Sequence, residues 1–447
     1  MALKFFKIFS MLLFVSILLS ATLTLQDAVK IALINNQSIL FPSNQQYQSA
    51  KLEYKIHNAQ YYPQLRFFSL SENNLKRFRS TLILSDKVIP YLGTDLEANL
   101  FVNPFNTRDG ELRVSLVQPL SPQRILESFL SEKNTRDNLN VAEIQRDIAK
   151  QNLILEVVNS YFGLVRILNS IKRVEQSIKS TESLIEVIKV KVEGGLAAPS
   201  ELSNFYLQRN LEMASYEELL QSFRTSKEEF LRLLGIEIED SLVLQEDIPL
   251  NVGDFDLETC WKRALQKNPE LMIFKIQLNQ IEGNLKAQKL YFFPDVNFSL
   301  NYTRPFEAFS GILSPQMELS LQWPLFTAGI LKSRKKLAEE QYKLALFNYE
   351  ELKYRLRKEI ENLLFQIEVA KKKLKLYEAS RELAAEALRV AELKYRSGAL
   401  SYQEYYFNLQ RYEETEENYF NLKTEVFILY TRLLRLMGDL NLERIQQ

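Results

Sequence analysis

The sequence predicts a mainly α-helical protein that also supplies strands to a membrane β-barrel. Three observations support this fold class. The sequence contains an internal repeat, and each half has the order helix, strand, strand, long helix, turn and shorter helix. Each half contains a very long stretch nearly free of proline and glycine, which predicts a long helix. The expected strands alternate apolar and polar residues, as strands of outer-membrane barrels do.

The composition disfavours several classes of protein. Of the 447 residues, 46% are hydrophobic, which is enough for a folded core. Lys plus Arg and Asp plus Glu number 56 each, so no excess of positive charge indicates a nucleic-acid partner. The single cysteine, Cys260, and the single histidine, His57, exclude an intrachain disulfide, a cysteine-rich zinc site and a histidine cluster. We therefore expect no metal site and no cofactor, with Cys260 buried and His57 on a helix surface.

The N-terminus has the order of residues found in secretory signal peptides. Lys4 and Lys7 precede an apolar run from Ile8 to Leu19, and the small residues Ser20 and Ala21 follow. We expect residues 1–21 to be this peptide and the mature chain to be exported. No later stretch is expected to reach the roughly 18 to 20 apolar residues of a spanning helix. A mature chain that crosses a membrane would then have to do so as a closed barrel.

The duplication is visible in two pairs of segments. One pair is TLQDAVKIALINN, from Thr24, and DLETCWKRALQKN, from Asp256. The other is SLVQPLSPQRI, from Ser115 to Ile125, and SLQWPLFTAGI, from Ser320 to Ile330. Thr24 and Asp256 are each placed to cap a helix N-terminus. In the second pair an alternating strand ends at proline and leucine, shortly before a long helix.

These matches divide the mature chain into two repeats with one connection of variable length. The first repeat is 22–250, with a β-hairpin at about 63–120 and a helical hairpin at about 123–235; the second is 251–447, with a β-hairpin at about 294–325 and a helical hairpin at about 328–438. The connection between the two strands is longer in the first repeat. Because exposed loops tolerate changes of length, we expect the loops Ser71–Gly110 and Arg304–Pro315 to project into water.

The alternating strands predict a lipid-facing surface. The residues expected to face lipid are Val296, Phe298, Leu300 and Tyr302 in one strand and Met317, Leu319, Leu321 and Trp323 in the next. A half-buried sheet of a soluble protein would show the same alternation, so the pattern alone leaves both readings open. Two hairpins give only four strands, whereas the smallest common barrels have about eight. Several copies of the chain would therefore share one barrel, which predicts an oligomer.

The helical stretches are longer than those of most globular proteins. Leu331 to Ser397 contains no proline or glycine, and Ile125 to Glu193 is interrupted only by Gly163. At ~1.5 Å per residue, each stretch makes a helix of about 100 Å. Apolar residues at spacings of three and four in the second stretch predict a coiled-coil seam. A turn with glycine and a return helix follow each stretch, so each repeat is expected to contain an antiparallel helical hairpin.

With these features in place, the chain resembles the TolC-type outer-membrane efflux and secretion channels, the outer membrane factors. The resemblance rests on the signal peptide, the duplicated order, the two strand ends, PLFTAG at Pro324 to Gly329 and the two glycine turns. It covers essentially the whole mature chain. It implies a homotrimer in which each chain gives four strands to a twelve-stranded barrel in the outer-membrane lipid, with a helical tunnel across the periplasm. The implied partners are a periplasmic adaptor, or membrane fusion protein, and an inner-membrane transporter.

The resemblance also implies functional positions at the ends of the helical hairpins. The positions that correspond to the adaptor-docking tip are Gly195, Leu196, Glu201, Gly398, Ala399 and Glu404. Some family members close the tip with a basic and an acidic residue, but Leu400 and Phe407 occupy those positions here. We therefore expect apolar packing of Tyr395, Leu400 and Tyr402 to replace ionic closure. Both glycines would also be needed for a tight turn in any protein.

The strand ends are the expected transition from barrel to tunnel. The residues assigned to it are Pro119, Leu120, Pro324, Leu325 and Gly329. Proline lacks the N–H that further strand pairing needs. Arg124 stands where the second repeat has Gly329, so the two transitions are expected to bend differently.

The expected function is a passive exit duct rather than an enzyme. No nucleophile with a base, phosphate loop or metal constellation is visible in the sequence, and the many glutamates fit helix surfaces. A periplasmic coiled-coil adaptor or scaffold without a barrel is the alternative, because such proteins also contain long helical hairpins.

Overall fold

The computed structural model describes residues 23–72, 77–89, 93–103, 106–195, 197–236, 243–245, 253, 255–305 and 315–441. The predicted signal peptide, 1–21, lies outside the described residues. Contacts divide the chain into two compact units, each considered by itself. The helical unit comprises Met1–Phe41, Asp147–Asn268 and Arg355–Gln447, and the sheet unit comprises Pro42–Arg146 and Pro269–Tyr354.

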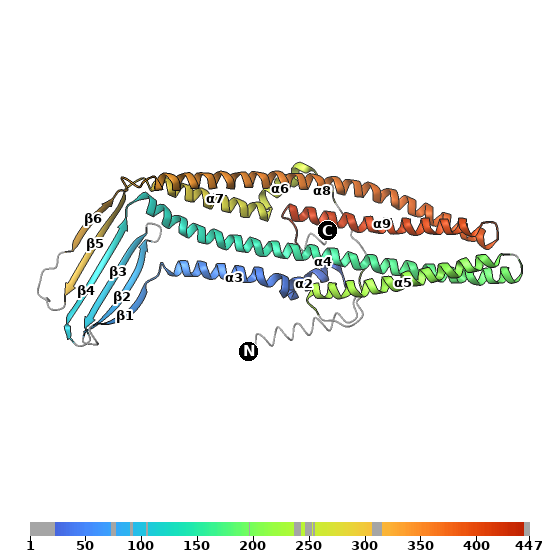
Figure 1. The fold of residues 1–447 in the computed structure, drawn as a ribbon, viewed down its shortest axis with the longest axis horizontal. Helices are drawn as coiled ribbons and strands as arrows, with labels where there is room; N and C mark the ends of the chain where they lie inside the picture. Colours follow the sequence, from blue (N-terminus) through green and yellow to red (C-terminus); the bar gives the residue numbers. More distant parts are fainter. Residues whose placement is uncertain are drawn as a thin grey trace. The chain divides into compact units, whose positions relative to one another are not determined.

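The sheet unit contains one antiparallel sheet whose strands lie in chain order (Figure 1). Six strands form it within the described residues. They are β1 (Gln64–Glu72), β2 (Arg77–Ile89), β3 (Thr94–Asn103), β4 (Asn106–Pro119), β5 (Asp295–Pro305) and β6 (Gln316–Gln322). β4 and β5 join the two repeats, because Val114 lies opposite Tyr302 and Leu116 opposite Leu300. The two repeats therefore build one sheet, with β1 and β6 at its edges.

The first repeat contributes four strands, not the two that the sequence predicted. The expectation of an exposed loop from Ser71 to Gly110 is wrong, because most of this segment belongs to the strands β1 to β4. β2 pairs with β1 on one side and with β3 on the other, so the sheet satisfies its backbone groups. The signal was present in the sequence. Leu96, Ala98, Leu100 and Val102 alternate with Asp95, Glu97, Asn99 and Phe101.

The second repeat contributes β5 and β6. Of the loop predicted between them, Arg304 and Pro305 form the end of β5, and residues 306–314 lie outside the described residues. The mainly helical fold with antiparallel strands agrees with the predicted fold class, and the strand number is the difference.

The prediction of very long helices is confirmed. The helix α4 (Pro122–Glu193) has 72 residues and α8 (Ile330–Arg396) has 67. The helices α5 (Pro199–Leu234) and α9 (Tyr402–Leu436) follow them after short turns and run back beside them (Figure 1). The other helices are α2 (Leu25–Asn35), α3 (Gln37–Ala59), α6 (Leu257–Lys267) and α7 (Pro269–Leu290).

The predicted seam of α8 is a buried stripe. Its buried residues are Leu352, Leu356, Ile360, Leu363, Ile367, Ala370, Ala384, Ala391 and Tyr395. Arg381, which breaks the apolar spacing, forms an ion pair of 2.7 Å with Glu416 instead. Cys260 is buried, as expected, and the Nε2 atom of His57 lies 2.9 Å from the Tyr61 hydroxyl.

One expectation about α4 is wrong. This helix contains a stretch long and apolar enough, by composition, to cross a membrane, although no such stretch was predicted. The core helix of a packed protein passes the same test, and 44% of the stretch is buried within the structure. The buried residues Leu153, Val157 and Leu164 belong to the core of the helical unit, and the Tyr161 hydroxyl donates to the Leu23 carbonyl at 3.0 Å. We assign this stretch to helix packing.

The duplication extends to a detail of helix ends in the helical unit. The side chain of Asn36 donates to the carbonyl of Leu233 at 2.7 Å. In the second repeat, Asn268 donates to the carbonyl of Leu436 at 2.9 Å. Each asparagine satisfies a carbonyl in the last turn of a return helix, which has no partner within the helix itself. The two repeats thus tie the short helix to the return helix in the same way.

Candidate functional site: hairpin ends and strand-to-helix junction

The two helical hairpins end in turns that require glycine. Gly195 has φ 70° and Gly398 has φ 79°, both in the left-handed region that favours glycine. A Cβ atom at either position would have no neighbour within 4 Å, so the backbone conformation alone requires the glycine. Ala399 is exposed, and its N–H donates to the carbonyl of Lys394 at 2.9 Å. Leu196 lies outside the described residues.

The two predicted docking glutamates have different local roles. Glu404 is exposed and completes a capping box: its Oε2 accepts from the Ser401 N–H at 3.2 Å, and its own N–H donates to Ser401 Oγ at 3.3 Å. Glu201 lies in the first turn of α5, which begins with Pro199 and has no side-chain cap. A change at Glu404 therefore affects the start of α9 as well as the surface charge.

The three residues predicted to close the tip belong to one apolar cluster, here called the tip cluster. It is formed by buried Leu184, Ile185, Ile188, Phe205, Ala391, Tyr395, Tyr405 and Leu409, with the partly buried Val192, Leu202, Leu388, Leu400, Tyr402 and Tyr406 around them. These residues come from α4, α5, α8 and α9, so the cluster holds both hairpins together. Phe407, at the position of an acidic residue in some channels, is 62% exposed.

Aromatic rings form the centre of the tip cluster. The ring centroids of Phe205 and Tyr402 are 4.5 Å apart in an edge-to-face arrangement, and those of Tyr395 and Tyr405 are 5.4 Å apart and stacked. Such pairs contribute about 0.5–1.5 kcal/mol beyond the burial of their area. Lys191 donates to the Tyr395 carbonyl at 3.3 Å, and its Nζ lies 5.7 Å from the centre of the Tyr395 ring. Packing and one cation therefore hold the end of α8 against α4.

Two tyrosines of the cluster, Tyr395 and Tyr402, have raised pKa values. Burial, followed by the nearby Glu201 carboxylate, raises the pKa of Tyr395, and burial raises the pKa of Tyr402 to about 12. The Tyr395 hydroxyl oxygen is buried and has no hydrogen-bond partner within the described part of the chain. The ring of Tyr395, rather than its hydroxyl, is thus the part that stabilises the cluster.

A buried carboxylate lies in the helical unit on α5. Glu212 is 8% exposed, and its Oε1 accepts three hydrogen bonds. The donors are Ser177 at 2.9 Å, Thr181 at 3.2 Å and Gln208 at 2.9 Å. These bonds satisfy Oε1, whereas the buried Oε2 has no hydrogen-bond partner within the described residues.

A second carboxylate, Glu413 on α9, faces Glu212. Burial is the main cause that raises the pKa of Glu413, and the charge of Glu212 raises it further. The nearby Ser177 hydroxyl and the charge of Arg173 oppose this shift. Arg173 also donates to the Glu413 carbonyl at 3.0 Å and pairs with Glu417 at 3.5 Å. No sequence pattern predicts this arrangement, because all these residues resemble ordinary helix-surface residues.

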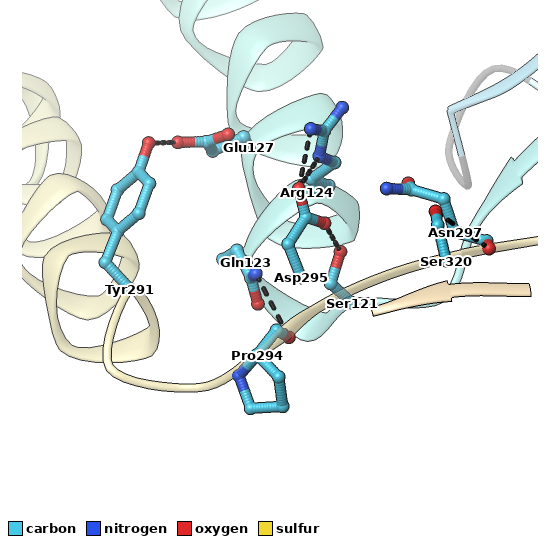
Figure 2. A network of polar contacts seen from close by, with 9 residues as sticks. All are labelled: Ser121, Gln123, Arg124, Glu127, Tyr291, Pro294, Asp295, Asn297 and Ser320. Carbon is cyan, nitrogen blue, oxygen red and sulfur yellow. Dashed lines mark hydrogen bonds and ion pairs between the residues drawn. The ribbon is translucent and has the colours of Figure 1, made fainter. Parts of the chain in front are cut away.

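The strand-to-helix junction of the first repeat is a polar network (Figure 2). Arg124 binds Asp295 through Nε at 2.8 Å and Nη2 at 2.6 Å. Ser121 Oγ donates to the other oxygen of Asp295 at 2.6 Å, and Gln123 Nε2 donates to the Pro294 carbonyl at 3.4 Å. These contacts join the start of α4 in the first repeat to the start of β5 in the second.

One backbone hydrogen bond and one side-chain hydrogen bond complete this junction. Pro119 is the last residue of β4, and the N–H of Leu120 donates to the Val296 carbonyl at 2.8 Å, one residue beyond the strand. The Tyr291 hydroxyl donates to Glu127 in the second turn of α4 (Figure 2). The helix therefore begins only three residues after the strand, at Pro122.

The second junction is looser and bends differently. After Pro324, Leu325 is 82% exposed and α8 begins only at Ile330. Ala328 has φ 47° and Gly329 has φ 84°, so the chain turns through left-handed backbone here. At the position matching Gly329, Arg124 lies in the first turn of α4 and binds Asp295.

The residues predicted to face lipid lie on one face of the sheet. Directly opposed residues of antiparallel strands share a face. The opposed pairs are Val296 with Leu321, Phe298 with Leu319, Leu300 with Met317, and Tyr302 with Val114. Trp323 follows the end of β6, and its indole N–H donates to the Phe292 carbonyl at 3.3 Å.

We predict that the ring of Tyr395 determines the stability of the tip cluster. Tyr395→Ala should remove about 3 kcal/mol of packing at a buried aromatic and speed amide hydrogen exchange near both hairpin ends. Tyr395→Phe keeps the ring and removes only a hydroxyl without a described partner, so it should exchange like the parent. Equal exchange in the alanine and phenylalanine variants would contradict this account.

We predict that Glu413 makes the helical unit less stable as the pH rises. Its pKa is raised in the folded state, so folding favours the protonated form. This contribution is complete below the unfolded pKa of about 4.3 and is lost as the pH rises through the folded pKa. Glu413→Gln should match the parent at low pH and melt at a higher temperature at neutral pH, as followed by circular dichroism. Glu414→Gln, at the exposed neighbouring residue, is the control. A difference in melting temperature between Glu413→Gln and the parent that does not change with pH would refute this role of Glu413.

Comparison with known proteins places these features in a family. Residues 261–439, most of the second repeat, match the model of the outer membrane efflux protein family. A comparison with curated protein sequences finds no match.

Solved structures with the same fold cover nearly the whole chain. The outer membrane protein VceC of Vibrio cholerae superposes with a TM-score of 0.68 at 16% identity, over 93% of this chain and 96% of VceC. The MtrE outer membrane channel of Neisseria gonorrhoeae, in its open state, gives 0.68 at 16% identity, over 93% and 89%. The CmeC outer membrane channel of Campylobacter jejuni gives 0.65 at 15% identity, over 94% and 88%.

The resemblance predicted from the sequence is confirmed by these matches. The outer membrane, the predicted location, is that of the family matched by residues 261–439. Residues 261–439 are thus similar to the outer membrane efflux protein family, and the chain has the fold of the TolC-type outer-membrane channels.

Proposed function

We propose that the protein is the outer-membrane exit duct of a tripartite efflux or type I secretion system. In this proposal, three copies share one barrel in the outer membrane, and their helical hairpins extend into the periplasm. Substrates would pass from an inner-membrane transporter and a periplasmic adaptor to the exterior without energy input by the duct.

One observation carries this proposal. The sheet has an apolar face that continues across its strands, and within the described residues each of its two edge strands pairs with a neighbouring strand on one side only. On β6, Met317, Leu319 and Leu321 are each more than 60% exposed. Exposed apolar residues beside an open sheet edge favour association in water, and lipid does not tolerate an open edge. A barrel closed between copies would cover the edge and place the apolar face in lipid.

The exposed hairpin ends support a docking role for them in the proposed duct. Gly195, Gly398 and Ala399 are exposed at the turns, and Glu404 is exposed beside them. The tip cluster below them holds the four helices together without ionic closure between Leu400 and Phe407. We assign adaptor docking to this exposed surface and closure of the tip to Tyr395 and its neighbours.

The alternative is a periplasmic coiled-coil adaptor or scaffold without a barrel. It would explain the helical hairpins equally well. It gives no reason for a sheet whose apolar residues lie in register on one face, from Leu65 in β1 to Met317 in β6. The channel proposal explains both parts of the chain.

Membrane fractionation with an unheated gel tests the proposed function. The mature chain should occur in the outer-membrane fraction and run as an oligomer that becomes a monomer after heating. The barrel explains this result, because its edge strands would pair between copies and hold the oligomer together until heating. Recovery as a monomer in the soluble periplasmic fraction would support the scaffold alternative and contradict the duct.

The docking role of the tip predicts a specific pattern of cross-linking to the adaptor. Glu404→Gln removes the charge but keeps a residue that fits a capping box, so it should weaken adaptor cross-linking if the charge contributes. Ser401→Ala is the matched control, because it removes the cap and keeps the charge. Glu201→Gln tests the first repeat in the same way. If Ser401→Ala weakens cross-linking while Glu404→Gln does not, the charge of Glu404 has no docking role.

A further inference from the structure

We propose that β2 and β3 form an additional membrane-spanning hairpin, so that three copies of this chain enclose an eighteen-stranded, water-filled pore. The inference rests on the proposed trimeric duct. The resemblance implied four strands per chain and twelve in the barrel. The sheet of this chain has six strands in its described residues, and three such sheets give eighteen.

β2 and β3 extend over the same part of the sheet, along the strand direction, as the neighbouring strands β1 and β4. β2 pairs with β1 from Ser85 opposite Gln64 to Arg77 opposite Glu72. β3 pairs with β4 from Asp95 to Asn103. β4 in turn pairs with β5 along its length. The hairpin is therefore as long as the strands assigned to the membrane and does not project beyond them as a loop.

The apolar face of the sheet continues through the added hairpin with two charged exceptions, Asp86 opposite Leu96 and Arg304 opposite Leu112. Residues that lie directly opposite one another on neighbouring strands share a face. One row across the sheet is Leu65, Leu84, Ala98, Val114 and Tyr302, a second is Phe67, Leu82, Leu100 and Leu112, and a third is Leu96, Leu116, Leu300 and Met317. In β2, Leu82 and Leu84 are both exposed. This arrangement suits contact with lipid along the whole width of the sheet.

The opposite face is polar in the added hairpin as well. One row across it is Ser85, Glu97, Ser115, Asn301 and Gln316. Asn99 donates to the Glu97 carboxylate at 2.9 Å, and the charges of Arg113 and Glu111 pair on the same face. Charged groups in a membrane strand are tolerated where they face a water-filled lumen. The added strands thus extend a pore wall as well as a lipid-facing surface.

The inner turn of the hairpin is fitted to the strand-to-helix junction. Gly93 has φ 68°, and a Cβ there would lie 3.2 Å from Pro119 Cγ. Thr94 is 4% exposed and donates through its hydroxyl to Gln118. Gly93 and Thr94, at the start of β3, therefore lie against the end of β4, shortly before α4 begins. This contact holds β2 and β3 in register with the rest of the sheet.

The number of strands sets the width of the pore. Barrel diameter grows roughly linearly with strand number, so eighteen strands give about 1.5 times the diameter of twelve. Barrels of 16 to 18 strands leave an aqueous channel, as in porins. The exit of this duct is accordingly wider than the resemblance implied, which suits bulky or hydrated cargo.

Cysteine labelling of the full chain in lipid vesicles tests the hairpin. The probe is a charged maleimide that does not cross membranes, applied to Leu82→Cys, Leu100→Cys, Ser85→Cys and Asn99→Cys. The two polar-face cysteines should react, and the two apolar-face cysteines should react on the order of tenfold more slowly, because the reactive thiolate needs water. Equal labelling at all four positions would overturn the inference, since an exposed loop would give that result. Cys260 is buried, so the parent chain measures the background.

A second pair of positions separates this inference from the proposed function. Leu300→Cys and Asn301→Cys lie on the apolar and polar faces of β5, which spans the membrane in a barrel of either size. If labelling differs between the two faces in β5 but not in β2 and β3, the added hairpin is refuted and the proposed duct still holds. Equal labelling of the two faces of β5 would refute the duct itself. Leu84→Cys replaces Leu82→Cys if that variant does not form the oligomer seen on the unheated gel.

Discussion

The pairing of backbone groups at the edges of the sheet is the constraint on which the rest of the architecture depends. Within lipid, each N–H and C=O must find a partner inside the protein. Within the described residues, a single copy satisfies this for β2 to β5, whereas β1 and β6 each pair with a strand on one side only. In the proposed duct, closure by further copies would meet this requirement. It also explains why a chain rich in helices retains exposed apolar residues such as Phe67 and Leu319 on its edge strands.

The duplication supplies this architecture with two similar but unequal halves. In the helical unit, Asn36 and Asn268 tie a short helix to a return helix in the same way in both repeats. The sheet unit is where the halves differ: the first repeat has the added hairpin and a tight junction at Arg124, and the second has a looser junction at Gly329. The ion pair of Arg124 with Asp295 fixes the start of α4 to the first strand of the other repeat. The strand-to-helix junctions of the two repeats therefore differ in how firmly the long helix is held to the sheet.

The sequence predicted features that depend on local pattern and missed those that depend on pairing. The long helices followed from the absence of helix breakers, and the buried stripe of α8 from its spacing. The apolar packing of Tyr395, Leu400 and Tyr402 followed from Leu400 and Phe407 at two positions that are charged in some channels of this type, and the structure places all three residues in one cluster. The strands β2 and β3 lie where the difference in length between the repeats predicts a loop, although the residues from Asp95 to Val102 alternate as in a strand. The partners of Arg124 and Glu413 lie far along the chain, so no local signal could reveal them.

Electron cryo-microscopy of the full chain in lipid nanodiscs tests the central claim most directly. The account predicts three copies whose sheets close into one barrel, with β1 of each copy paired to β6 of the next and no free strand edge in the lipid. A single copy with an open sheet, or an assembly held together only by its helices, would contradict it.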